Sequence, residues 1–328
     1  MGIRNLNRYL RNNCPDSIRC IPISDISHKK IAVDISIYLY KYEAENTLLE
    51  NMFIMLSIFR YYNIIPIFIF DGKPPDEKKE LLQKRKEDKK FAREEYYKLQ
   101  QSLQEITSLQ EITSSQEDKQ DIIATMDQLK KQFVNINKDK IENVKSLIRA
   151  YGATYYDAPG EADELCALLV LKKKVWACLS EDMDLFVYGC SRVLRYFSLV
   201  SHTVVLYYTK GILNELNMSH KEFKEVCILS GTDYNINTNN NVNLKSTIEY
   251  YHKYKKTDNS NKTTFYDWLQ LNTDYITDIY SLNKINNMFN LDCNNKKLDI
   301  FNNIKIVNGQ IKQQEIENIM KSEDFIFL

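Results

Sequence analysis

The sequence predicts an α/β protein with a mostly parallel central sheet and helices on both faces. Short apolar runs recur at residues 31–33, 64–70 and 175–179, and each stops at or shortly before an aspartate. Fully buried parallel strands have this continuous apolar profile, and such sheets gather ligands at the carboxyl ends of their strands. Helical patterns follow or separate these runs. We therefore expect several acidic side chains to meet at one edge of the sheet.

Composition describes a globular chain without a strong overall charge. The 328 residues are 44% apolar and include 44 basic and 44 acidic residues, so binding to a polyanion would depend on local segregation of charge. The seven cysteines are scattered without a CxxC pair, which argues against a disulfide framework or zinc ribbon and fits reduced, intracellular surroundings. No signal peptide is visible, and we read the most apolar window, Met52–Phe70, as a helix followed by a buried strand.

The first third of the chain supplies two of the acidic strand ends. It opens with MGIRNLNRYLRNNC, an amphipathic helical pattern with apolar residues on one side and arginines around them. Asp34 ends the first buried strand, and Ile35–Met55 is expected to continue as one helix. Asp71 ends the second strand, which runs from Ile64 to Phe70. A lone aspartate at such a place usually caps a helix or starts a turn, but two with the same placement favour a shared site.

The central stretch, PGEADELCALLVLKKKVWACLSEDMDLF, supplies four more carboxylates. Glu161 and Asp163 stand at a helix start, and Asp182 and Asp184 follow the apolar strand 175–179. Such a cluster repels itself near a core unless cations neutralise it. Oxygen-only ligands favour Mg²⁺ or Mn²⁺ over zinc. The alternative is a solvated acidic helix start plus an acidic loop, but two pairs around one strand favour the metal site.

Between these acidic segments lies a basic and then a low-complexity region. Residues 73–93 hold nine basic residues against five acids, which is typical of a solvated helix face but also suits a nucleic-acid backbone beside a ligand strand. Residues 94–130 include the tandem hexapeptide SLQEIT SLQEIT at Ser102–Thr113. We expect an exposed, mobile helical insertion there without catalytic residues.

The remaining chain is expected to contain a hairpin and then helices. Residues 192–208 have the Val-, Leu- and Tyr-rich pattern of a β-hairpin, and 221–229 are helical. Asp233 follows this helix beside Gly231 and adds a seventh carboxylate. An Asn-rich loop then leads to a helix at 244–256, and the polar residues beyond it form short helical patterns.

These motifs resemble those of the flap endonuclease family of structure-specific 5′ nucleases, in the XPG-like superfamily. MGIRNL, IAVDIS, IFDGKPP, DAPGEADELCA, LSEDMDLF and LSGTDYN match the family's motifs in order and at similar spacing, up to about residue 250. The resemblance implies a PIN-like 5′-nuclease fold with a helical arch. It also implies a metal-binding role for seven carboxylates: Asp34, Asp71, Glu161, Asp163, Asp182, Asp184 and Asp233.

The resemblance implies further site residues. Lys78 and Arg85 fall on the family's catalytic basic pair at the base of the arch, and Tyr40 falls on the residue that stacks on a base beside the scissile bond. A buried helix aromatic is the alternative reading of Tyr40. The DNA-binding residues that it implies are Gly2, Tyr40, Lys73, Lys84 and Lys245. Asp163 stands where the family usually has Glu, which could shift a water-mediated metal contact.

Under this resemblance the chain divides into a nuclease core and a small helical part. The core spans 1–256, with an N-terminal region 1–93, an arch insertion 94–130, an internal region 131–234 and a degenerate helix-hairpin-helix 228–256; the helical part spans 257–328. The implied function is a metal-dependent 5′ flap endonuclease and 5′–3′ exonuclease in DNA replication, repair or recombination. It would use two Mg²⁺ ions, with Mn²⁺ able to substitute. The alternatives are a gap, end or four-way-junction nuclease of the same superfamily, and a non-catalytic DNA-junction scaffold.

This sequence departs from the family at two places that concern its partners. Where the family has a Gly-rich, ion-binding hairpin, this chain has NINTNNNVNLKST, and its last residues, KSEDFIFL, lack the glutamine of a sliding-clamp peptide. We therefore expect flapped or branched DNA as partner, without assuming a clamp, and a monomer away from membranes. A composition rich in Asn, Lys, Ile and Tyr is typical of proteins encoded by an AT-rich genome, such as that of a large DNA virus or a protist. The expected location is the nucleus or, for a virus, a cytoplasmic replication site.

Overall fold

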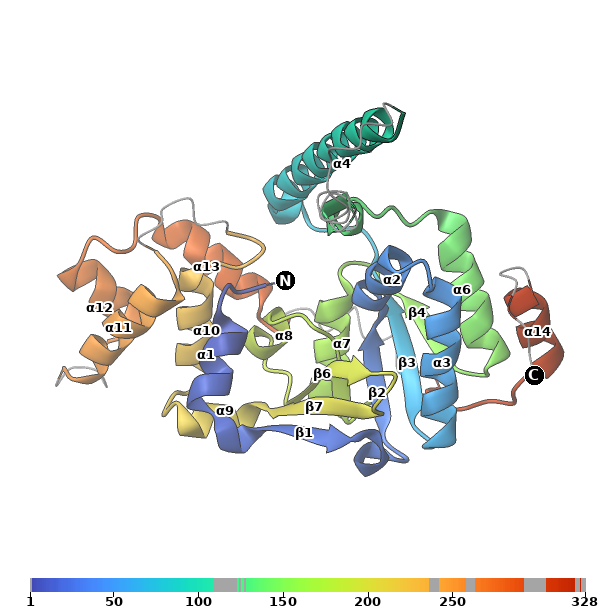
Figure 1. Ribbon diagram of the computed structural model, residues 1–328. Helices are drawn as coiled ribbons and strands as arrows, with labels where there is room; N and C mark the ends of the chain where they lie inside the picture. The colour runs from blue at the N-terminus through green and yellow to red at the C-terminus, as the bar shows by residue number, and fades with distance from the viewer. Residues whose placement is uncertain are drawn as a thin grey trace.

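A computed structural model gives the arrangement of the chain (Figure 1). It describes residues 2–108, 123, 125–126, 128–235, 242–257, 263–291, 305–321 and 325. Within these residues there is no helix whose length and apolar content would let it span a lipid bilayer.

The described residues form a seven-stranded sheet in the order β1-β7-β6-β5-β2-β3-β4. Its strands are β1 (Ile18–Pro22), β2 (Lys30–Asp34), β3 (Ile65–Phe70), β4 (Thr154–Asp157), β5 (Ala177–Leu179), β6 (Arg192–Ser198) and β7 (Thr203–Tyr208). Four neighbouring pairs are parallel: β2 with β3, β2 with β5, β3 with β4, and β5 with β6. Only the β6–β7 and β7–β1 pairs are antiparallel. The mostly parallel sheet is thus confirmed, and the hairpin expected at 192–208 is β6 and β7.

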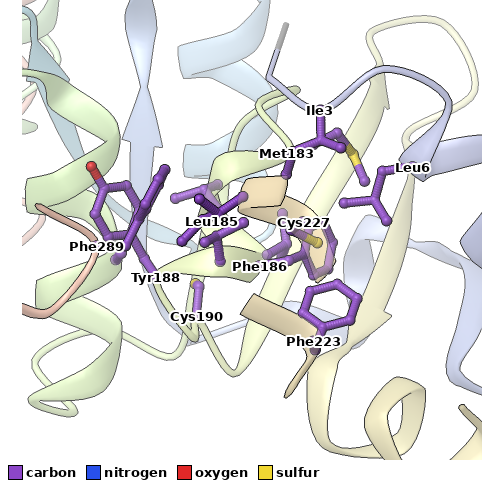
Figure 2. Close-up of a cluster of buried hydrophobic side chains, with 14 of the residues drawn as sticks. Ile3, Leu6, Met183, Leu185, Phe186, Tyr188, Cys190, Phe223, Cys227 and Phe289 are labelled. Carbon is purple, nitrogen blue, oxygen red and sulfur yellow. The ribbon is translucent and has the colours of Figure 1, made fainter. Parts of the chain in front are cut away.

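Helices cover both faces of the sheet, as predicted. Alternate residues of a strand point to opposite faces, so in β2 Ala32 joins one apolar core while Ile31 and Val33 join the other. The first core contains residues of α1 (Leu6–Asn13), α7 (Ala162–Leu171), α8 (Asp184–Val187) and α10 (His220–Ser230). The second contains residues of α2 (Ile35–Ala44), α3 (Leu48–Tyr61), α6 (Lys138–Ala150) and α14 (Gln313–Lys321). Figure 2 shows part of the first core, where Ile3 and Leu6 lie close to Met183.

The single helix expected at Ile35–Met55 is wrong, because the chain forms two helices there. Asn46, between α2 and α3, adopts the left-handed conformation with φ of 55°, which asparagine tolerates better than most residues. The amide of Thr47 donates to the carbonyl of Tyr42 at 3.0 Å and closes the turn. α3 and α2 therefore pack as a pair on one face of the sheet.

The basic segment after β3 is helical and projects from the core. A short 3₁₀ turn, η3 (Asp76–Lys78), leads into α4 (Lys79–Ser108), which rises above the rest of the molecule in Figure 1. The first hexapeptide copy belongs to α4, and most of the second lies outside the described residues. The expected mobility of the insertion therefore stays a prediction.

The other described elements flank these layers. They are η1 (Pro15–Ser17), η2 (Ile23–Ile26), α9 (Thr209–Glu215), α11 (Leu244–Lys255), α12 (Phe265–Asn272) and α13 (Ile279–Met288). α11, α12 and α13 pack on α10, at the left of Figure 1. The Asn-rich stretch between α10 and α11 falls largely outside the described residues, so the degenerate helix-hairpin-helix expected at 228–256 stays a prediction.

The last described segment returns to the core. Residues 305–312 run past the amino ends of β3 and β4, where the Gly309 amide donates to the Gly152 carbonyl at 2.7 Å. Arg60 of α3 donates to the Gly309 carbonyl at 2.8 Å. α14 then packs on α6, with Ile316 and Met320 buried. This end of the sheet is thus covered by residues from the far end of the sequence.

Candidate metal centre and active site

A cleft of about 820 Å³ lies at the carboxyl ends of the parallel strands, next to the start of α4. Six of the seven predicted carboxylates line it: Asp34, Asp71, Glu161, Asp163, Asp182 and Asp233. Tyr40, Lys78 and Arg85 line it too. Strand ends and helix ends far apart in the sequence therefore bring six of the predicted acids and the predicted basic pair to one place.

Asp34 and Asp71 are positioned by neighbouring parallel strands. Asp34 ends β2 and caps α2, accepting a hydrogen bond from the Ser36 amide at 3.3 Å and another from the Ser180 hydroxyl at 2.8 Å. Asp71 follows β3 and accepts from the Ser36 hydroxyl and, at 2.8 Å, from the Ala162 amide. The start of α7 is thereby tied to β3.

The loop after β3 can approach α7 closely because residue 72 is glycine. The Gly72 amide donates to the Gly160 carbonyl at 2.7 Å. A Cβ at position 72 would lie 2.0 Å from the Ala158 carbonyl oxygen, which is sterically impossible without a backbone shift. This close approach places Glu161, the N-cap residue of α7, and Asp163, in its first turn, opposite Asp71.

Asp182 and Asp184 occupy the turn after β5. The Asp184 amide donates to Oδ1 of Asp182 at 2.9 Å. Asp184 is 1% exposed, and its Oδ1 has no hydrogen-bond partner among the described residues. Gly2 packs directly on this pair, since a Cβ there would lie 2.6 Å from Oδ1 of Asp184 and 2.7 Å from Oδ1 of Asp182. Only a residue without a side chain fits.

Burial and mutual repulsion disfavour the charged forms of these acids. Burial, then the charges of Asp71 and Asp182, raise the pKa of Asp34 to about 7, although hydrogen bonds from Ser180 and Ser36 oppose the shift. The pKa values of Asp163 and Asp184 are raised well above the usual range, again by burial first and then by the neighbouring charge of Asp182. The site therefore holds more negative charge than the protein alone stabilises.

Lys78 and Arg85 supply part of the missing positive charge. Lys78 is buried and forms ion pairs with Glu161 and, at 3.5 Å, with Asp233. Burial by itself would lower the pKa of Lys78, but the charges of Glu161, Asp163 and Asp233 raise it. Arg85 pairs with Asp233 at 2.9 Å. Lys78 therefore stays charged, and both basic side chains are engaged by the acids of the cleft.

Sequence reasoning missed three residues that shape the site. The Tyr234 hydroxyl donates to Glu161 at 2.6 Å, and the Lys78 ammonium lies 5.6 Å from the centre of the Tyr234 ring. Ser36 and Ser180 hold Asp34 and Asp71. Two of them could have been suspected from the sequence, because Ser36 stands two residues after Asp34 and Tyr234 stands next to Asp233.

The predicted DNA-binding residues lie in different places. Gly2 touches the carboxylates, and Tyr40 lines the cleft with 49% of its surface exposed, so the buried alternative for Tyr40 is wrong. The Lys89 ammonium lies 5.1 Å from the Tyr40 ring centre. Lys73, Lys84 and Lys245 are exposed and do not line this cleft. Their DNA-binding roles stay predictions.

The chemistry of these donors fits a hard divalent cation. All seven acids offer oxygen, Asp184 keeps an oxygen without a partner among the described residues, and the raised pKa values show excess negative charge. Over the same residues, no group of three or more His, Cys, Asp or Glu side chains is arranged to enclose an ion directly. The ion pairs of Lys78 and Arg85 offer a physical reason, because they engage Glu161 and Asp233.

Fold and site together define a protein of the 5′-nuclease fold with an acidic cleft. The structure resembles the catalytic core of Rad2, with a TM-score of 0.65 at 20% sequence identity over 98% of this chain and 95% of the other. It also resembles flap endonuclease-1 from Methanococcus jannaschii, with a TM-score of 0.55 at 20% identity over 93% of this chain and 97% of the other. The predicted fold is confirmed by these likenesses.

Sequence comparison identifies the family. Residues 1–92 match the XPG N-terminal domain, and 152–233 match the XPG I-region. Flap endonuclease 1 of Encephalitozoon cuniculi is 30% identical over 251 residues, covering 71% of this chain and 68% of that protein. A probable RAD2-like endonuclease of Invertebrate iridescent virus 6 is 26% identical over 283 residues, covering 72% and 68%. This chain belongs to the XPG-like flap endonuclease family, which uses divalent metal ions.

The match to larger relatives is partial. Flap endonuclease 1 of Glycine max is 31% identical over 253 residues, which cover 71% of this chain but 62% of the soybean protein. The matched region thus spans less than two thirds of that relative.

Proposed function

We propose that this protein is a structure-specific 5′ flap endonuclease with 5′–3′ exonuclease activity, dependent on two Mg²⁺ ions for which Mn²⁺ can substitute. The observation that carries the proposal is the gathering of six predicted carboxylates with Lys78 and Arg85 around one cleft. A non-catalytic DNA scaffold has no need of buried, mutually repelling acids, which cost stability without a cation.

Each part of the cleft has a distinct task in phosphodiester hydrolysis. The seven carboxylates would hold the cations, with several contacts through water because Mg²⁺ retains much of its hydration shell. Bound cations would supply Lewis-acid polarisation of the phosphate and activation of water. Asp71, with its link to the Ala162 amide, and Asp34, with its link to Ser180, keep the ligands of different strands in register.

Lys78 and Arg85 would stabilise the negative charge that develops on the scissile phosphate. In the free protein their partners are Glu161 and Asp233. Lys78 and Arg85 would be free to contact the phosphate when Glu161 and Asp233 serve as cation ligands instead. The exposed ring of Tyr40, at the cleft wall, would stack on the base beside the cleaved bond.

The test is cleavage mapping on a matched set of 5′-labelled substrates with a flap, nick, gap, free end or four-way junction, with Mg²⁺, Mn²⁺ or EDTA. We expect the flap to be cleaved fastest, near its single-strand/double-strand junction, and EDTA to abolish cleavage. Preferred cleavage of four-way junctions would instead support the junction nuclease of the same superfamily. Binding without cleavage in either metal would contradict an enzyme and support a scaffold.

A further inference from the structure

The solvent face of α1 carries positive charge that the carboxylate cleft does not use. Arg8 and Arg11 are three residues apart on α1, so their side chains share one helix face, and Arg4 stands in the turn just before α1. All three are exposed, and α1 contains no acidic residue. No ion pair within the described part of the chain involves any of them.

The opposite face of α1 fixes the direction of these arginines. Leu6 and Leu10 of α1 are fully buried, and Ile3 is 3% exposed. In Figure 2, Ile3 and Leu6 lie beside Met183, in the turn that carries the acidic pair. α1 cannot rotate without exposing this apolar surface. Arg4, Arg8 and Arg11 are therefore held toward solvent; we call them the α1 arginine stripe.

A tyrosine in an unusual conformation supports the end of the stripe. Tyr196, at an irregularity in β6, has φ of 55° and is 42% exposed. Its amide donates to Glu181, and its hydroxyl accepts a hydrogen bond from the Asn7 side chain at 2.7 Å. The guanidinium of Arg11 lies 5.5 Å from its ring centre, and that of Arg195 lies 5.0 Å away. A non-glycine residue in this region costs about 1–3 kcal/mol and persists where surrounding contacts require it.

The stripe begins next to the acidic pair. Gly2 packs on Asp182 and Asp184, and Arg4 follows two residues later. From there α1, eight residues and so about 12 Å long, leads away from the carboxylates. A DNA whose scissile phosphate lies in the cleft would have further phosphates within reach of this surface.

We propose that the α1 arginine stripe, with Tyr196 supporting Arg11, binds the phosphate backbone of a double-stranded arm of the DNA substrate. The proposal rests on the proposed function. Guanidinium groups bind phosphate in bidentate fashion, and stacking on an aromatic ring pre-orients Arg11. Since guanidinium groups already lie over the Tyr196 ring, the ring supports a cation rather than a base. The contact is accordingly one of charge and position, without sequence selectivity.

The test measures how DNA binding depends on salt. Affinity of a fluorescent flap substrate is determined in Ca²⁺ over a range of KCl concentrations for the wild type and for R4Q/R8Q/R11Q. Each phosphate contact contributes about −0.9 to the slope of log K against log salt. We expect the triple variant to lower the magnitude of this slope by about 2–3. R11Q and Tyr196→Leu should each lower it by about 1 or less.

The matched control is K172Q/K173Q/K174Q. These three lysines are exposed in the turn between α7 and β5, at the amino end of the sheet, so the control removes the same charge far from the cleft. Its slope should equal that of the wild type. Equal slopes for wild type and R4Q/R8Q/R11Q, or equal losses in both triple variants, would overturn the proposal.

Substrates with one duplex arm shortened test the double-stranded assignment. Shortening one arm, but not the other, should remove the difference between the wild type and R4Q/R8Q/R11Q. If the difference survives both truncations, the stripe contacts single-stranded DNA and the duplex assignment is wrong. A wild type that neither binds nor cleaves DNA would instead contradict the proposed function itself.

Discussion

The two ends of the sheet differ in how their polar groups are paired. At the carboxyl ends, burial and then the charges of neighbouring acids raise the pKa values of Asp34, Asp163 and Asp184, and one oxygen of Asp184 has no partner among the described residues. At the amino ends, backbone groups are paired by the segment 305–312. The difference shows that repulsion is confined to the end that would bind cations, while the other end stabilises the fold.

Removing one acid should separate the two roles of the carboxyl end. We expect Asp184→Asn to abolish flap cleavage in Mg²⁺ because a cation ligand is lost. In EDTA at pH 8 the same change should raise the melting temperature, since it removes an acid whose charged form is disfavoured by burial and by the charge of Asp182. Cleavage assays and thermal melts measure both effects.

The control for this change is Asp157→Asn, at the end of β4, where the carboxylate is 57% exposed and pairs with Lys145 at 2.8 Å. It should keep cleavage and gain no stability. Near wild-type turnover by Asp184→Asn would show that the metal assignment is wrong.

The next largest effect is expected at Arg85. Arg85→Ala should lower the single-turnover rate at saturating enzyme by roughly ten- to a thousandfold, as for loss of one transition-state donor. Arg149→Ala, which removes an arginine bonded to Tyr155 and Ser146 on α6, is the matched control and should leave the rate unchanged. If Arg85→Ala only weakens DNA binding, and added salt weakens wild-type binding in the same way, then Arg85 is an ordinary solvent-facing residue of the helix and not a transition-state donor.

A substitution at the amino end should affect stability alone. Gly152 has φ of 69°, and a Cβ there would lie 2.6 Å from the Gly309 carbonyl carbon. We expect Gly152→Ala to cost about 1–3 kcal/mol, which lowers the melting temperature by about 2–4 °C per kcal/mol. The cleavage rate of the folded enzyme should not change. Gly160→Ala is the stability control, because its Cβ would meet only Glu164 Oε2 at 3.7 Å.

The smallest expected effect is a dependence on pH of the stabilisation that Mg²⁺ gives the folded protein. The folded pKa of Asp34 is raised to about 7, so the folded protein keeps a proton that the unfolded chain has already lost. Binding of this proton contributes to the free energy of unfolding. The contribution is fully present below the ordinary aspartate pKa and is lost as pH rises through about 7. Mg²⁺ should therefore raise the melting temperature more at pH 8 than at pH 5.5.

Asp34→Asn is the comparison for this effect, because it removes the titrating group. Its melting temperature in EDTA should fall less than that of the wild type between pH 5.5 and pH 8. An equal fall in the two proteins would show that Asp34 does not carry the linkage.

The strand ends and their acids could be predicted because burial leaves a simple pattern: apolar runs followed by Asp34, Asp71 or Asp182. Contacts between distant segments could not. The position of Tyr234 next to Asp233 places it near the site, but its hydrogen bond to Glu161, 73 positions away, has no local sequence signal. The break between α2 and α3 was missed because Asn46 takes the left-handed turn without the usual Gly or Pro signal. The place of residues 305–321 depends on packing against α3 and α6, which no local pattern encodes.

The return of residues 305–312 to Gly152 also sets when the amino edge of β3 and β4 is covered during synthesis. Gly309 emerges from the ribosome 157 residues after Gly152, roughly 8–30 s later at ordinary elongation rates. Until then α3 lacks the carbonyl that Arg60 contacts, and α6 lacks the helix that packs on it. The amino ends of β3 and β4 are thus covered late, and a nascent chain interrupted before residue 305 would leave this edge uncovered.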